Sequence, residues 1–145
     1  MEALVVGAGV SGLSCGIRLQ EAGRRVRIVA EARTPETTSD VAAAYYFPAR
    51  MAPDSRLPRW GLASLAEFRR LEKVPEAGVL ATRAMELYRH APTAPPWWAA
   101  MVENVRAAPS LDVPRGFEAG IQCDSVVVQM PVYLRYLEGR FADGG

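Results

Sequence analysis

The sequence predicts an α/β fold that opens with two parallel β-strands joined by a helix. Apolar, β-branched runs at residues 2–6 and 26–30 are typical of buried strands. Between them, Leu13, Ile17 and Leu19 repeat at helical spacing, and Gly23 follows as a helix stop. A strand, a helix and a second strand within about 30 residues form the unit from which parallel sheets are built.

The rest of the chain predicts further helices and strands separated by proline-rich connections. Apolar residues at mostly helical spacing indicate an amphipathic helix over 60–71, and the runs at 79–88 and 125–128 indicate strands. Trp97 and Trp98, which follow a proline-rich stretch, are expected to anchor it in the core. Pro131 favours the start of a final helix.

Composition narrows the class of protein. The 145 residues are 50% hydrophobic and 23% charged with a net charge of +1, which is typical of a globular protein and argues against nucleic-acid or membrane-surface binding. No apolar run reaches the roughly 18 residues of a membrane span, and no leader-like segment precedes the first strand. With Cys15 expected to be a buried, reduced thiol, these features predict a cytoplasmic protein.

The clearest functional signal is the G-x-G-x-x-G sequence of residues 7–12, which leaves the first strand and opens the first helix. Gly7 can take the tight turn, Gly9 leaves room for a pyrophosphate, and Gly12 lets the helix pack near the strand. The helix N-terminus offers N–H groups and a partial positive charge to phosphates. Glu31 follows after roughly 20 residues and can bind a ribose with a free 2′-hydroxyl. This pattern predicts a dinucleotide site without distinguishing NAD from FAD.

Three further segments resemble the D-amino-acid oxidase family of FAD-dependent oxidoreductases. Residues 34–48, T-P-E-T-T-S-D-V-A-A-A-Y-Y-F-P, resemble the family's flavin-contacting stretch. Residues 94–98, A-P-P-W-W, resemble an element of bacterial members, and residues 125–134, S-V-V-V-Q-M-P-V-Y-L, resemble a strand-to-helix segment. The segments occur in the family's order and are spread along most of the chain.

The resemblance implies the N-terminal half of such an enzyme, with FAD as cofactor and no metal. It implies a Rossmann-like, parallel FAD-binding part at residues 1–50, the first part of an antiparallel substrate domain at 51–130, and a helix returning toward the FAD-binding part at 131–145. By matching position, the resemblance implies that the pyrophosphate would be held by Gly7, Gly9, Val10, Ser11 and Gly12, and the adenosine ribose by Glu31, Ala32 and Arg33. The phosphates and the ribityl chain would be held by Thr37, Thr38 and Ser39, and the flavin ring by Ala43, Ala44 and Tyr45.

Some of these residues have a second possible role, and others differ from the residues common in the family. The hydroxyl cluster at 37–39 is also suited to cap a helix ahead of Val41. Many relatives have glycine at the position of Ala44, an aliphatic residue at that of Tyr45, and aspartate at that of Gln129, which is assigned no chemistry. His90 is expected to lie on the surface or to be structural, and Asp40 to be a hydrogen-bonding loop residue.

The implied activity is oxidation of an amine or amino acid by hydride transfer to flavin, with a small-molecule substrate whose identity and chirality stay open. The tyrosine and arginine that grip the substrate in the family lie beyond this chain, so no residue is assigned as catalytic. A second chain supplying the C-terminal half, in a heteromer, is one explanation of the length; a shortened form and a free-standing half-domain are the others. Alternative functions are a biosynthetic protein that reuses the fold with FAD in another role, and a nucleotide-binding regulatory half-domain.

Overall fold

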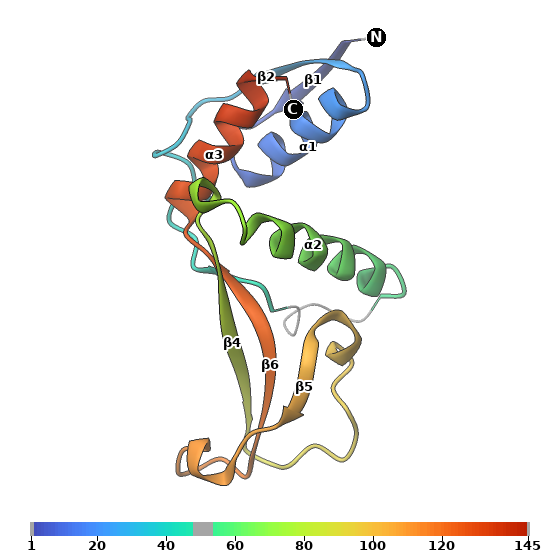
Figure 1. Ribbon diagram of the computed structural model, residues 1–145, viewed down its shortest axis with the longest axis vertical. Helices are drawn as coiled ribbons and strands as arrows, with labels where there is room; N and C mark the ends of the chain where they lie inside the picture. Colours follow the sequence, from blue (N-terminus) through green and yellow to red (C-terminus); the bar gives the residue numbers. More distant parts are fainter. Residues whose placement is uncertain (1, 48–53, 145) are drawn as a thin grey trace. The chain divides into compact units, whose positions relative to one another are not determined.

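The computed structural model describes residues 2–47 and 54–144, which divide into two compact units (Figure 1). Unit 1 comprises Met1–Ala44, Val74–Val79 and Val128–Gly145. Unit 2 comprises Tyr45–Lys73 and Leu80–Val127. The chain therefore leaves unit 1 twice and returns to it twice.

Unit 1 is built on a parallel pair of strands, β1 (Glu2–Val6) and β2 (Arg25–Val29), joined by α1 (Val10–Glu21). The ladder continues past β1, because the Gly7 N–H donates to the Val29 carbonyl at 2.7 Å. The predicted strand–helix–strand unit is thus confirmed, with both its helix and its second strand beginning one residue earlier than expected.

The last helix of the chain, α3 (Met130–Ala142), packs against α1 within unit 1. Gly16 allows this close approach, since a Cβ at that position would lie 3.0 Å from a ring carbon of Phe141 and 3.1 Å from Cδ1 of Ile28. Gln20 adds a hydrogen bond from its Nε2 to the Phe141 carbonyl at 3.0 Å. The two ends of the chain are therefore joined in one small core.

The β1–β2 sheet carries helices on one face, and its other face exposes apolar side chains. Side chains alternate between the two faces along a strand. Val5 lies toward α1, with its Cγ1 3.5 Å from where a Cβ on Gly12 would be. Leu4 and Val6 lie on the opposite face and are 63% and 80% exposed.

Unit 2 combines α2 (Leu57–Leu71) with most of a four-stranded sheet. In this sheet β6 (Ala119–Val128) lies between β3 (Ala44–Tyr45) and β4 (Val79–Tyr88), and it also pairs antiparallel with β5 (Glu103–Ala107). The sheet supplies the antiparallel part that the resemblance implied.

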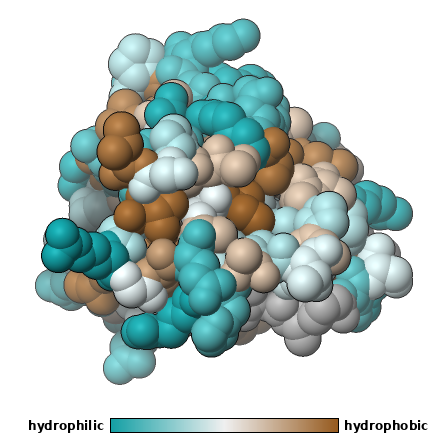
Figure 2. All heavy atoms as spheres, turned by 90° about the horizontal axis from the view of Figure 1, so that it is seen from below, coloured by the Kyte–Doolittle hydropathy of each residue, from teal (hydrophilic) through white to brown (hydrophobic). Residues whose placement is uncertain are grey.

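On the face of the molecule shown in Figure 2, hydrophobic residues lie in several groups separated by hydrophilic ones.

The core of unit 2 surrounds Trp98, which is 1% exposed. Its Nε1 donates to Glu86 at 3.0 Å, and the ring of Phe47 packs against it with centroids 4.9 Å apart. Tyr88 also donates to Glu86, and burial together with this carboxylate raises the pKa of Tyr88. The expectation of a core anchor is confirmed for Trp98, whereas Trp97 is 37% exposed.

The prediction that Cys15 is buried is wrong. The buried side of α1 carries Leu13, Gly16 and Ile17, so Cys15 lies on the other side of the helix and is exposed. Cys123 is the buried thiol, and burial raises its pKa. Within residues 2–47 and 54–144, no helix has the length and apolar character needed to cross a membrane.

Candidate cofactor site

The turn of residues 7–12 joins β1 to α1 and requires glycine at two positions. Gly7 has φ +102°, a conformation that side-chain-bearing residues rarely adopt. At Gly12 a Cβ would lie 1.9 Å from the Gly7 carbonyl oxygen. The first position shapes the turn, and the second lets the helix begin directly against it.

The N-terminus of α1 lies in this turn, with Gly9 as its N-cap residue and no capping hydrogen bond from a side chain at that position. The first N–H groups of a helix have no partner inside the helix and carry a partial positive charge. Of these groups, the Val10 N–H donates to Ser39 Oγ at 3.1 Å. Ser11 is exposed and Gly12 half-buried, so this part of the helix end can be reached from solvent.

Ser39 comes to the turn from a loop far along the sequence. A Cβ on Gly9 would lie 2.8 Å from the Ser39 hydroxyl oxygen, so the absence of a side chain at Gly9 makes room for it. The predicted capping of a helix ahead of Val41 is wrong, because residues 41–47 form no helix. Ser39 instead caps the first helix of the chain, which sequence reasoning missed.

Asp40 organises the loop that carries Ser39. It accepts hydrogen bonds from Thr34 Oγ1 at 2.6 Å and from the Thr37 N–H and Oγ1 at 2.9 and 2.6 Å. Burial by itself raises the pKa of Asp40, but the hydrogen bonds from Thr34 and Thr37 outweigh it and the pKa lies below its ordinary value. The expectation of a hydrogen-bonding loop residue is confirmed, and the Thr37 hydroxyl is the donor of one of these bonds.

Asp40→Asn is expected to destabilise the protein at neutral pH and to flatten its acid sensitivity. Because the folded-state pKa of Asp40 is lowered, its contribution is present above the unfolded-state pKa and is lost as the pH falls through the folded-state pKa. Urea unfolding at about pH 7 and about pH 3 tests this. Asp143→Asn, at an exposed residue of unit 1, is the control. Equal pH dependence in wild type and Asp40→Asn would contradict the assigned role.

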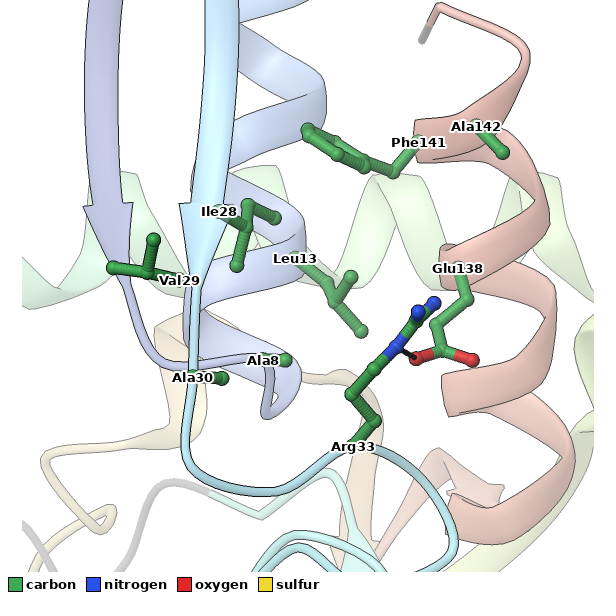
Figure 3. Close-up of a pocket in the computed structure, with 9 residues that line it drawn as sticks. All are labelled: Ala8, Leu13, Ile28, Val29, Ala30, Arg33, Glu138, Phe141 and Ala142. Atoms are coloured by element: carbon green, nitrogen blue, oxygen red, sulfur yellow. Dashed lines mark hydrogen bonds and ion pairs between the residues drawn. The ribbon is translucent and has the colours of Figure 1, made fainter.

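Residues 31–33 follow β2 at the same edge of the sheet as the glycine-rich turn, because β1 and β2 are parallel. Glu31 is exposed and Ala32 half-buried. Arg33 extends toward α3, where its Nε donates to Glu138 Oε1 at 3.0 Å (Figure 3). The side chain of Glu138 is 19% exposed, and no local signal could have linked it to a residue so distant in the sequence.

A hollow of about 380 Å³ lies between β2 and α3, and we call it the β2–α3 trough. Figure 3 shows the strands on one side, α3 on the other, and the Arg33–Glu138 pair near the end where β2 finishes. Apart from this pair its lining is apolar and includes Leu13, Ile28, Phe141 and Ala142.

The remaining predicted site residues lie farther along the chain. Thr38 and Ala43 are exposed, and Ala44 is half-buried in β3. Tyr45 is 55% exposed and its ring stacks on that of Phe47 with centroids 5.8 Å apart. The division between the units falls between Ala44 and Tyr45.

His90 lies on the surface of unit 2. The side chain of His90 is 91% exposed and contacts Glu118 at 3.3 Å, as expected of a surface residue. Among the residues that the structure describes, no cluster of histidine, cysteine, aspartate or glutamate side chains could hold a metal ion.

Comparison with known proteins identifies the family of this chain. The family model of the FAD dependent oxidoreductases, DAO, matches residues 2–145. The chain belongs to this family. The cofactor of the family is FAD, which is the nucleotide that the glycine-rich turn and Glu31 alone left undecided.

Two curated relatives of this DAO-family chain are D-amino-acid oxidases. That of Rubrobacter xylanophilus is 39% identical over 143 residues, which cover 99% of this chain and 44% of the relative. That of Dictyostelium discoideum is 27% identical, and the match covers 98% of this chain and 42% of the relative. The chain therefore spans less than half the length of these relatives.

Solved structures share the fold of this DAO-family chain at low sequence identity. An L-amino acid deaminase from Proteus myxofaciens, in complex with anthranilate, matches with a TM-score of 0.73 at 15% identity, over 99% of this chain and 36% of its own. A glycine oxidase from Bacillus cereus matches with a TM-score of 0.64 at 17% identity, over 99% and 44%. The α/β fold with a parallel pair and an antiparallel sheet is therefore shared with these two solved structures.

Proposed function

We propose that this chain is the FAD-binding front part of a D-amino-acid-oxidase-like enzyme that oxidises an amine or amino acid. The observation that carries the proposal is the turn between β1 and α1. Gly7 and Gly12 fix its shape, and the solvent-accessible helix N-terminus behind it offers N–H groups to an anion. We place the pyrophosphate beside the Ser39 hydroxyl at this turn, because the missing side chain of Gly9 leaves the backbone open to close approach.

We assign different residues of this chain to different parts of the cofactor. We assign the pyrophosphate to the N–H groups of the turn, with Ser39 holding the Val10 N–H in place. The exposed Glu31 carboxylate can accept hydrogen bonds from the ribose hydroxyls. The proposed contacts are Gly7, Gly9, Val10, Ser11 and Gly12, then Glu31, Ala32 and Arg33, then Thr37, Thr38 and Ser39, and finally Ala43, Ala44 and Tyr45.

Bound FAD would supply the redox chemistry by accepting a hydride from the substrate, while this chain binds and orients it. We assign no catalytic residue in this chain. A complementing chain that carries the rest of the fold would complete the enzyme as a heteromer, in keeping with a match to only 44% of the Rubrobacter xylanophilus relative. The unpaired Cys15 and Cys123 support a reducing, cytoplasmic location.

Flavin reduction tests the proposal. The chain is produced together with the C-terminal remainder of the Rubrobacter xylanophilus D-amino-acid oxidase, and the visible spectrum of the purified complex is recorded. We expect a flavin band that bleaches when D-amino acids are added without oxygen. A complex without flavin would refute FAD binding. A flavin band that persists with both D- and L-amino acids would refute the oxidase and favour a protein that uses FAD in another role.

A further inference from the structure

Asp40 closes the tight turn that carries Ser39. The Asp40 N–H donates to the Thr37 carbonyl at 3.0 Å, and the Thr37 N–H donates in return to Asp40 Oδ2 at 2.9 Å. Thr38 and Ser39 lie between these two residues and form the middle of a four-residue turn. The backbone of Ser39 is therefore held from both sides.

The carboxylate of Asp40 holds the rest of the loop through charge-assisted hydrogen bonds. Asp40 is 9% exposed, and the hydroxyls of Thr34 and Thr37 each donate to one of its oxygens at 2.6 Å. Hydrogen bonds to an ionised carboxylate are roughly twice as strong as those between neutral groups. Protonation would therefore weaken these bonds together, and it would add a hydrogen where three donors already point at two oxygens.

Arg135 of α3 is the charged side chain whose field acts on this carboxylate. Burial raises the pKa of Asp40, but the hydrogen bonds from Thr34 and Thr37 outweigh burial. Arg135 lowers this pKa further, and an arginine keeps its charge over the whole acid range. Glu36, the other acid of the loop, is exposed, and none of the hydrogen bonds described for Asp40 involves it. Acid titration of these loop contacts therefore belongs to Asp40.

Ser39 links the loop to the turn of residues 7–12. Its Oγ accepts from the Val10 N–H at 3.1 Å and lies 2.8 Å from where a Cβ on Gly9 would be. A hydroxyl that accepts a hydrogen bond still has its own proton to donate. Within the described part of the chain no group accepts that proton, so a phosphate oxygen at the turn can accept it.

We propose that Asp40 is a positioning residue for the cofactor: its ionised carboxylate holds the Ser39 hydroxyl at the turn, and its protonation weakens FAD binding. This inference rests on the proposed function, in which the turn of residues 7–12 holds the FAD pyrophosphate. Asp40 itself touches no part of the cofactor and acts through Ser39. By linkage, bound FAD makes Asp40 harder to protonate.

Positioning and direct charge repulsion predict opposite effects of pH. A carboxylate repels the negative pyrophosphate, so repulsion alone would make FAD bind more tightly once Asp40 is protonated. Under positioning, the contribution of Asp40 is present at neutral pH and is lost as the pH falls through its pKa, which lies below the ordinary value. The direction of the change in FAD affinity therefore separates the two effects.

FAD affinity as a function of pH tests the proposal. FAD is titrated against the chain in complex with the C-terminal remainder of the Rubrobacter xylanophilus D-amino-acid oxidase, from about pH 7 to about pH 3. We expect wild-type affinity to fall at least about tenfold over this range. Asp40→Asn is expected to bind FAD about fivefold more weakly at neutral pH and to lose most of the pH dependence. Circular dichroism at each pH verifies that the protein is folded.

Glu36→Gln is the matched control, because it makes the same change from carboxylate to amide at an exposed position of the loop. It should keep the wild-type pH profile. Thr34→Val removes one donor to Asp40 without changing any charge, so the pKa of Asp40 should rise and the loss of FAD affinity should begin at a higher pH. This shift decides the outcome if Asp40→Asn does not fold.

A double-mutant cycle tests whether Asp40 acts through Ser39. In the Ser39→Ala background, Asp40→Asn should weaken FAD binding by less than about twofold, because the hydroxyl that it positions is already absent. An undiminished loss in that background would overturn the positioning role.

The Val10 amide reports the same coupling without FAD. Its N–H chemical shift, measured by NMR on the full chain, should titrate with Asp40 in wild type and not in Asp40→Asn. A Val10 amide that does not respond to Asp40, or an FAD affinity that rises as the pH falls, would overturn the proposal. A complex that binds no FAD at neutral pH, while Val10 still follows Asp40, refutes the proposed function and leaves the coupling of Asp40 to the turn standing.

Discussion

Gly12→Ala is expected to lower the free energy of unfolding by about 3 kcal/mol or more, at the upper end of overpacking effects. The added Cβ would lie 1.9 Å from the Gly7 carbonyl oxygen. Because that oxygen belongs to the backbone of the turn, the clash can be relieved only by moving α1 away from β1. Urea unfolding monitored by circular dichroism measures the loss.

Gly139→Ala is the matched control for this substitution. Gly139 lies inside α3, and apart from its chain neighbours and the nearby backbone of its own helix no atom lies within 4 Å of its would-be Cβ. The same methyl group should therefore stabilise the protein there by up to about 1 kcal/mol, through helix propensity. If both alanines had similar effects, Gly12 would not be a contact point between helix and strand.

Gly9→Val is expected to weaken FAD binding by at least about 100-fold, or about 2.7 kcal/mol. Its Cβ would lie 2.8 Å from Ser39 Oγ and its branches would stand where we place the pyrophosphate. Ser39 can rotate away, so the fold is expected to survive while the helix loses its cap and its access to phosphate. Flavin released from the purified complex with the C-terminal remainder gives the occupancy.

Gly139→Val carries the same change into open space and should retain wild-type flavin content. Ser39→Ala separates the two effects of Gly9→Val, since it removes the cap without adding bulk. We expect Ser39→Ala to bind FAD with intermediate affinity. Normal flavin content in a folded Gly9→Val protein would refute the proposed pyrophosphate position.

The sequence predicts the parallel part of the fold well because its signals are local. The periodicity of 11–22 and the glycines on either side define α1 within a residue at each end. In contrast β6 extends over Ala119–Val128, although only residues 125–128 were expected. Gln122 interrupts the apolar pattern, yet it is 5% exposed and bonds to Asp112 at 3.3 Å. A polar residue satisfied by tertiary contacts cannot be distinguished from a loop residue in the sequence.

β5 was missed for a different reason. All five of its residues are exposed, so its sequence lacks the alternation that marks a half-buried strand. Asn104 adds a left-handed conformation with φ 53° where the pairing with β6 is irregular. Its pairing depends on a partner strand and not on its own pattern.

For the site, sequence reasoning located the turn and the acidic residue but not the contacts that support them. Ser39 bonds to Val10, and Arg33 bonds to Glu138. Both pairs join segments that meet only after folding. Hydrophobic spacing and turn chemistry carry no information about such pairs, which form only in the folded protein.

The exposed apolar side chains of Leu4 and Val6 also affect the stability of this protein inside a cell. Uncovered hydrophobic surface beside open strand edges promotes aggregation and is a target for chaperones and proteases. The abundance of the protein should therefore depend on whether those side chains become covered soon after translation. Any molecule left uncovered would be held by a chaperone or degraded.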